Sequence, residues 1–200
     1  MAKYKNSRIL PTILVVVVVI IAIIALISGA RALFTSNSTS NQKVTDTTVD
    51  SLLSTAASSS VSMTVRGPIV AEENFNSYKI VISPSSRQIT TYSGYMNDVV
   101  DQKNLGNNTA AYDQFVNALN LAKMTAGKEP EDGEGDVRGI CATGTLTEYS
   151  ILSDDRLVET LWTSTCSGSQ GTLRANNEQL SKLFVAQIPD SQALIRSVSL

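Results

Sequence analysis

The longest hydrophobic segment of the chain lies near its N-terminus. Residues 9–30 form 22 consecutive positions without a charged side chain, and residues 15–21 are all valine or isoleucine. As a helix, a segment of this length at about 1.5 Å per residue spans roughly 33 Å, which matches a hydrocarbon layer about 30 Å thick. The helix satisfies its own backbone polar groups, as lipid requires. The pattern therefore predicts a single transmembrane helix over residues 9–30 that contacts the lipid bilayer.

The charges flanking this segment predict its orientation. Lys3, Lys5 and Arg8 precede it, whereas Arg31 is the single basic residue close behind it. Basic residues collect on the cytoplasmic side of a transmembrane helix. We therefore expect residues 1–8 to form a basic cytoplasmic N-terminus. The C-terminal part of the chain is then expected outside the cell membrane, with the helix retained as a signal anchor.

A cleaved signal peptide is the alternative. Ala30, Arg31 and Ala32 have the small-x-small form that signal peptidases accept, so cleavage after Ala32 stays open. The uncharged stretch is longer than the roughly 7–15 apolar residues of a typical signal peptide. That difference favours retention of the helix.

A polar spacer follows the apolar segment. Between Thr35 and Ser60, 14 of 26 residues are serine or threonine. A segment of this composition does not bury enough apolar surface to offset the entropy of ordering it, so residues 31–60 are expected to form an extracytoplasmic stalk. Asp46 is a candidate N-cap for a short helix near the end of this stalk. The apolar positions that would share one face of that helix are Val49, Leu52, Leu53 and Ala56.

Beyond residue 60 the pattern changes between strand and helix periodicity. Alternation of apolar and polar side chains predicts strands at residues 61–65, 78–83, 87–92, 139–151 and 156–166. Apolar residues at helical spacing predict helices at residues 109–125, behind the N-cap Asn108, and 177–188. The tail is expected to add an edge strand through Leu194, Ile195 and Val198. The predicted fold of residues 61–200 is α+β, a small antiparallel sheet of about five to six strands covered by two helices.

The spacing of the two cysteines predicts a disulfide across the last hairpin. If that hairpin turns between Ser153 and Asp154, Cys141 lies directly opposite Cys166. Opposed positions without a hydrogen-bonded pair have Cα atoms about 4.5 Å apart, near the short end of the disulfide range. Two cysteines in an external domain are expected to pair. Two buried free thiols are the alternative.

Composition and charge narrow the possible chemistry. The 200 residues include no histidine and two cysteines, which excludes Ser-His-Asp and Cys-His catalytic sites and zinc sites made of imidazoles or four thiolates. Sixteen basic and 18 acidic residues give a net charge of −2, so no nucleic-acid partner is expected. Residues 32–200 carry twelve basic and eighteen acidic residues, a charge of −6. No cofactor is expected.

Two acidic segments are candidate sites. Asp132, Glu134 and Asp136 alternate with glycines and form a weak calcium candidate, because calcium prefers several oxygen ligands. The sixth position counted from Asp132 is a valine, so the EF-hand pattern fails, and a solvated acidic loop is the favoured alternative. Glu72 and Glu73, if in a strand, would point to opposite faces and share no acid–base site.

Three classes of function fit this layout. An anchor, a stalk and a disulfide-closed head without a recognisable catalytic constellation favour a non-catalytic binding domain at the cell envelope, with a protein or glycan partner. The layout also resembles that of type IV pilins, which implies a subunit of a pilus-like or secretion assembly. Residues 5–11 contain neither the small residue nor the glutamate of the pilin processing pattern, so that family is not assigned. The third class is a histidine-independent envelope enzyme, for example one with a Ser–Lys dyad.

Overall fold

The computed structural model of this chain describes residues 40–128, 137, 139–198 and 200. The expected transmembrane helix at residues 9–30 lies outside the described residues, as do the N-terminal residues 1–8 and residues 31–39 of the expected stalk. No helix within the described part of the chain is long and apolar enough to cross a membrane. Residues 45–200 form one compact unit.

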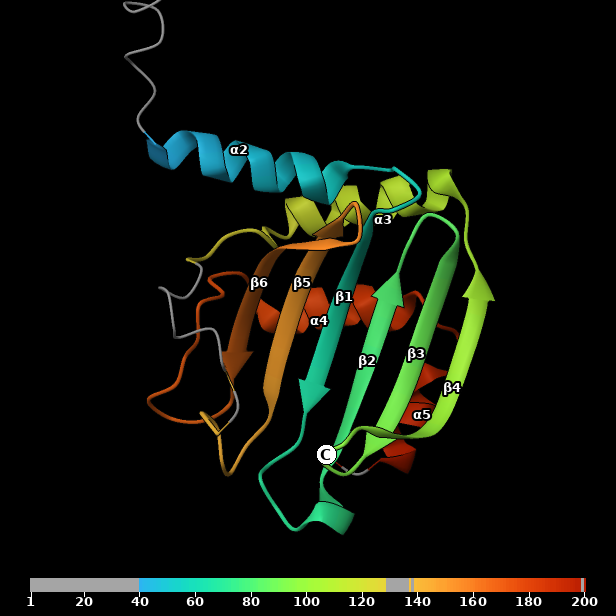
Figure 1. Cartoon of the computed structure of the whole chain (residues 1–200), viewed down its shortest axis with the longest axis vertical. Helices are drawn as coiled ribbons and strands as arrows, with labels where there is room; N and C mark the ends of the chain where they lie inside the picture. The colour runs from blue at the N-terminus through green and yellow to red at the C-terminus, as the bar shows by residue number, and fades with distance from the viewer. Residues whose placement is uncertain (1–39, 129–136, 138, 199) are drawn as a thin grey trace, which may run out of the picture. The chain divides into compact units, whose positions relative to one another are not determined.

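Six antiparallel strands form one sheet with the spatial order β4-β3-β2-β1-β5-β6 (Figure 1). In chain order the strands are β1 (Ser60–Arg66), β2 (Asn76–Ile82), β3 (Ser86–Ser93), β4 (Asp98–Gly106), β5 (Leu146–Ser153) and β6 (Arg156–Ser164). The α-helices are α2 (Ser40–Leu53), α3 (Thr109–Leu121), α4 (Asn177–Ala186) and α5 (Ser191–Ser197), and a 3-10 turn, η1, spans Glu72–Asn74. The predicted α+β class with an antiparallel sheet is confirmed.

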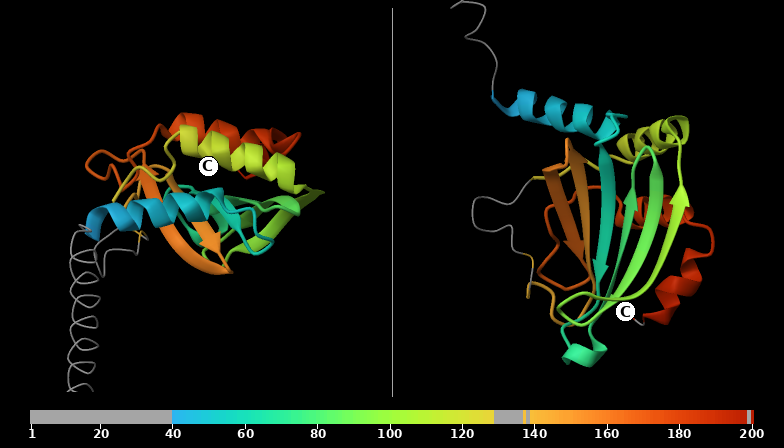
Figure 2. Two further views of the ribbon diagram at one scale, coloured as in Figure 1. Left: turned by 90° about the horizontal axis from the view of Figure 1, so that it is seen from above. Right: turned by 45° about the vertical axis from the view of Figure 1, so that its right-hand side comes forward.

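One face of the sheet is covered by α3 and α4, which lie side by side in the view from above (Figure 2). The alternating residues of the central strands point toward these helices. Both helices begin where the sequence predicts, because Asn108 and Asn176 cap them by accepting the backbone N–H of Ala111 at 2.9 Å and of Gln179 at 3.0 Å. The buried side chains of the two helices are Tyr112, Phe115, Val116 and Leu119 of α3, and Leu180 and Phe184 of α4.

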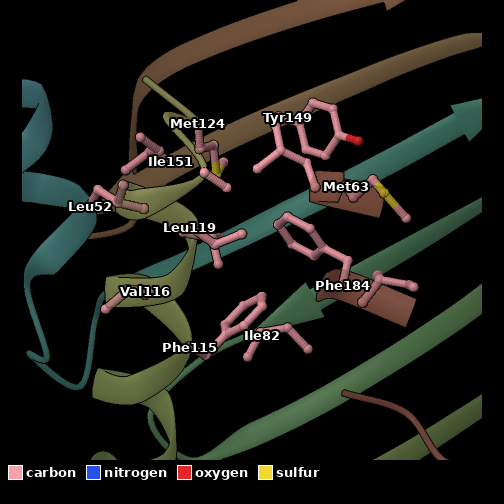
Figure 3. Packing of buried hydrophobic residues seen from close by; sticks show 14 of the residues in the cluster. Leu52, Met63, Ile82, Phe115, Val116, Leu119, Met124, Tyr149, Ile151 and Phe184 are labelled. Atoms are coloured by element: carbon pink, nitrogen blue, oxygen red, sulfur yellow. The ribbon is translucent and has the colours of Figure 1, made fainter. Parts of the chain in front are cut away.

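Phe184 lies in the middle of this core (Figure 3). Its ring meets that of Phe115 edge-on, with centroids 5.3 Å apart, and that of Tyr149 at 5.7 Å. The Tyr149 hydroxyl is satisfied by the side chain of Asn177, at 2.8 Å. Leu52 of α2 is fully buried in the same cluster. The core therefore joins α2, both covering helices and the sheet.

The helix predicted from Asp46 is present but longer. It begins at Ser40 and ends at Leu53, so Asp46 lies inside it rather than at its N-cap, and Ala56 lies beyond it. Burial of Leu52, rather than a capping residue at position 46, is the tertiary contact that anchors this helix.

Two elements at the margins of the sheet differ from prediction. β4 was not predicted, because this edge strand is polar and exposed along most of its length. Backbone pairing with β3 holds it, together with Leu105, which packs against the core, and Lys103, which donates to the Pro189 backbone oxygen at 2.6 Å. The tail forms α5 rather than an edge strand. The spacing of Leu194, Ile195 and Val198 also fits one face of a helical turn, and all three residues are at least partly buried.

The last hairpin has a different register from the predicted one. Asp154 and Asp155 both adopt left-handed conformations, with φ of 51° and 59°, and form its two-residue turn. A β-bulge lies between Ile151 and Leu152, just before this turn. On the side of the bulge away from the turn, Thr147 pairs with Thr163. β5 begins at Leu146, seven residues later than predicted.

Burial of Tyr112 predicts a loss of stability in alkali. Removal from water raises the pKa of Tyr112 from 10.0 to about 12. The folded state therefore holds this proton more tightly than the unfolded state, and the stabilisation is complete below pH 10 and lost as the pH rises from 10 toward 12. We expect the free energy of unfolding, measured by urea denaturation, to fall over that interval and to fall less steeply in Tyr112→Phe. Tyr92→Phe, outside the core cluster, is the control, and identical slopes in Tyr112→Phe and wild type would contradict the prediction.

Candidate binding pocket at the end of the sheet

A pocket of about 280 Å³ lies where β1 ends and β5 begins. Three segments that are distant in the sequence line it: the β1–β2 connection that carries η1, seen below the sheet in Figure 1, the β3–β4 turn, and the segment before β5. The lining residues are Arg66, Gly67, Ile69, Phe75, Tyr95, Asn97, Val137, Gly139, Cys141 and Leu146. Most of these side chains are apolar. We name this region the pocket end of the sheet.

Contacts around Tyr95 fix two of these segments to each other. The rings of Phe75 and Tyr95 stack with centroids 4.2 Å apart. The Tyr95 hydroxyl donates to the backbone oxygen of Val70 at 2.6 Å, and the Tyr95 backbone N–H donates to Glu72 Oε1 at 3.0 Å. Gly94 makes this turn with a φ of +72°, a conformation that residues with a side chain rarely adopt. The wall of the pocket is therefore preformed.

Among the described residues that line the pocket, Arg66 is the charged side chain. Its Nη1 atom lies 2.6 Å from Glu148 Oε2, in a contact that has the distance of an ion pair but not the alignment of a hydrogen bond. Arg66 and Glu148 sit diagonally on adjacent strands, on the sheet face opposite the helices. Because the two charges compensate each other, the floor of the pocket is close to neutral.

The predicted disulfide is present and forms one wall of the pocket. Cys141 and Cys166 are bonded, with Cα atoms 5.5 Å apart. The cysteines do not meet as a directly opposed pair of the hairpin, as the sequence predicted. Continued beyond the strands, the observed β5–β6 register would place Cys166 opposite position 144. Both cysteines instead lie outside the strands, and Gly144 lets them meet, because a Cβ there would contact Thr165 Oγ1 and both sulfur atoms.

A second, small hydrophobic cluster supports the segment before β5 from the helix-free face of the sheet. Trp162 of β6 is buried there against Val137 and Leu146, with Ile140 packed beside them. Val137 and Leu146 also line the pocket, so this cluster holds the pocket wall in place. The sequence contains no periodic signal for it, because its members come from an irregular segment and from single positions of two strands.

Exposed apolar side chains collect at the pocket end. Among the described residues nine large hydrophobic side chains are exposed, and six of them lie in the two connections or at the start of β4. These six are Ile69, Val70, Tyr95, Met96, Val99 and Val100. We name the first four the apolar rim, since they belong to the loops that form the pocket. The charged side chains of these loops and of the first residue of β4 are Glu72, Glu73 and Asp98, all exposed.

Of the acidic residues singled out from the sequence, Glu72 and Glu73 lie within the described part of the chain. Glu72 and Glu73 lie in the 3-10 turn η1 rather than in a strand, and Glu72 holds the Tyr95 backbone. The calcium candidates Asp132, Glu134 and Asp136 lie outside the described residues. Within the part of the chain that the structure describes, no group of three or more potential metal-ligating side chains comes together.

Comparison with protein-family models finds none that matches this chain. Comparison with curated proteins likewise finds no match. A functional interpretation therefore rests on the chemistry of the pocket and its rim.

Proposed function

We propose that this chain is a membrane-anchored extracytoplasmic protein whose head, residues 61–200, binds a partner at the cell envelope without catalysing a reaction. The uncharged stretch at residues 9–30 and the basic residues before it support the anchor and its orientation. The disulfide between Cys141 and Cys166 supports an oxidising location for the head.

The observation that carries the proposal is the pocket together with its apolar rim. Concave, mostly apolar sites with a few polar groups are the usual form of binding sites. Aromatic residues, methionine and arginine are enriched at protein interfaces, and Tyr95, Met96 and Arg66 occur together here. Clustering of exposed apolar side chains around a preformed cavity is therefore best explained by a partner that covers them.

The lining favours a protein partner over a glycan. A sugar requires several hydrogen-bonding groups around its hydroxyls, whereas Arg66 and Asn97 are the main polar side chains of this pocket. The Tyr95 hydroxyl is engaged by Val70, and one face of its ring is stacked on Phe75. Trp162 and Tyr149 are both buried in hydrophobic clusters and offer no exposed ring to a sugar.

The position of the pocket leaves it accessible. The chain enters the sheet from α2 through the start of β1 at Ser60, and β1 ends six residues later at Arg66, in the pocket. At about 3.3 Å per residue the two ends of β1 are roughly 20 Å apart. The pocket therefore opens at the end of the sheet opposite to the end where the chain arrives from its expected anchor.

Site-specific photo-crosslinking in cells tests this function. Met96 of the rim and Leu121 of α3 are equally exposed, at 82% and 83%, so a photoreactive amino acid at either position samples solvent to the same extent. We expect the probe at position 96 to give discrete adducts with a protein and the probe at position 121 to give none. Electrophoresis of the tagged full-length chain measures the adducts.

A variant of the pocket supplies the control. Ile69→Arg places a charge at the mouth of the cavity, on a side chain that is half-exposed, and is expected to abolish the position-96 adduct while leaving the protein folded by circular dichroism. Equal adducts at positions 96 and 121, or adducts that persist in Ile69→Arg, would contradict the proposed binding site. Adducts between two copies of the chain would instead favour the pilus-like or secretion assembly, and turnover of an envelope substrate by the purified protein would favour the enzyme.

A further inference from the structure

We infer that the occupant of this pocket is a single apolar side chain, presented by a partner protein and flanked by basic residues. This inference deepens the function proposed above and rests on it. It follows from the size of the pocket, the character of its walls and the charges around its mouth.

The size of the pocket sets the size of the occupant. Pockets that enclose a drug-sized ligand measure roughly 300–1,000 Å³. At about 280 Å³ this cavity lies just below that range, which suits one large aliphatic or aromatic side chain better than an extended molecule. A protein interface in which one anchoring side chain fills a pocket has the arrangement typical of binding hot spots.

The walls of the pocket select an apolar group. Ile69, Phe75, Val137 and Leu146 contribute hydrocarbon surface, and Cys141 is oxidised and offers no thiol. Arg66 does not attract an anion as an isolated cation would, because Glu148 lies 2.6 Å from its guanidinium. A buried anionic group of a ligand would therefore lose its hydration without gaining a full counter-charge.

The mouth of the pocket selects positive charge beside that group. Glu72 and Glu73 lie on the η1 side of the rim, and Asp98 follows the β3–β4 turn that contains Tyr95 and Asn97. All three carboxylates are exposed, and no basic residue lies in either of these two loops. Charge complementarity between the two sides of an interface sets its specificity and speeds association, so basic residues on the partner are favoured.

The same charges disfavour two other occupants. A second copy of the head would bring together two surfaces of equal charge, since residues 32–200 carry a net charge of −6. A membrane with anionic lipid headgroups would meet the carboxylates of Glu72, Glu73 and Asp98, and juxtamembrane attraction requires basic residues instead.

Binding of three short peptides to the full-length protein in neutral detergent tests the inference. The probes are fluorescently labelled, amidated peptides of sequence Gly-Lys-Phe-Lys-Gly, Gly-Glu-Phe-Glu-Gly and Gly-Lys-Ser-Lys-Gly, and fluorescence anisotropy gives the dissociation constants. We expect the first peptide to bind about tenfold tighter than either of the others, because each of the others lacks one of the two recognition elements. Its affinity is also expected to fall when sodium chloride is raised from about 50 mM to about 500 mM.

Charge reversal on the rim gives the sharpest comparison. The double variant Glu73→Lys and Asp98→Lys is expected to weaken the lysine-flanked peptide about tenfold and to strengthen the glutamate-flanked one. Both side chains are exposed, so the fold is retained. Leu121→Ala on α3 is the matched control and should change neither affinity.

The outcomes separate this inference from the proposed function. If the lysine-flanked and glutamate-flanked peptides bind equally and Ile69→Arg abolishes both, the pocket binds an apolar group and the basic flank is wrong. The inferred occupant is wrong if no peptide binds. It is also wrong if sedimentation shows a dimer of the protein that Ile69→Arg dissociates. Binding of vesicles that contain about 30% phosphatidylserine, lost in Ile69→Arg, would likewise contradict it. If the probe at position 96 of the otherwise wild-type chain gives no protein adduct in cells, by contrast, the proposed function itself is overturned.

Discussion

The double variant Cys141→Ser and Cys166→Ser is expected to unfold with a free energy lower by about 3 kcal/mol than that of the wild-type chain. The bond joins residues 25 positions apart, and its removal releases the unfolded chain from that loop constraint. Urea denaturation of the full-length protein, followed by Trp162 fluorescence, measures the loss. The same variant should weaken the position-96 crosslink, because Cys141 forms part of the pocket wall.

Reduction of the wild-type protein is the matched control for this variant. It removes the same constraint without changing the sequence, so the two should lose similar stability. Ser-for-Cys replacement adds only two small hydroxyls near the exposed Thr143 and Thr165. A loss below about 1 kcal/mol in the double variant would show that the unfolded chain is not restricted by this bond.

Phe184→Ala is expected to cost about 3–5 kcal/mol of folding stability. The side chain is fully buried, contacts Phe115 and Tyr149, and lies where α4 meets the sheet, so the variant leaves a cavity that the surrounding strands cannot fill. Chemical denaturation at neutral pH measures the change. Loss of the aromatic contacts adds to the loss of buried area.

Two further variants calibrate this effect. Phe184→Leu keeps most of the buried volume and should lose less stability than Phe184→Ala. Leu121→Ala removes an apolar side chain of similar size that is 83% exposed, and should stay within about 0.5 kcal/mol of wild type. Equal losses in Phe184→Ala and Leu121→Ala would mean that α4 does not cover the core as described.

The sequence predicts those strands and helices that bury one face, because their apolar residues recur at a regular spacing. In β1 the alternation of Val61, Met63 and Val65 reports a strand with one covered face, and all three side chains are buried. In α3 the cap Asn108 and the apolar stripe through Phe115 report both the start and the buried face. Such signals depend only on residues close together in the chain, so they can be recognised without the structure.

Features set by tertiary contact were not predictable. The register of the β5–β6 hairpin depends on a bulge after Ile151, which leaves no mark in the alternation of side chains. β4 is stabilised by backbone pairing with β3, which has little sequence signal, and by Lys103, which contacts Pro189 and Asp190 far along the chain. The pocket joins positions as far apart as Arg66 and Leu146, and its ion pair to Glu148 crosses two strands that are adjacent only in space.

The point at which the chain joins the sheet has a mechanical consequence. β1 follows α2 directly, yet it is a central strand, paired on both sides with β2 and β5. Tension applied to the head through its N-terminal tether would act first on the packing of Leu52. It would then act at the same time on the backbone hydrogen bonds of β1 to β2 and of β1 to β5, whereas tension on an outer strand would break the hydrogen bonds to a single neighbour. A domain attached in this way resists pulling more than one attached through β4 or β6 would.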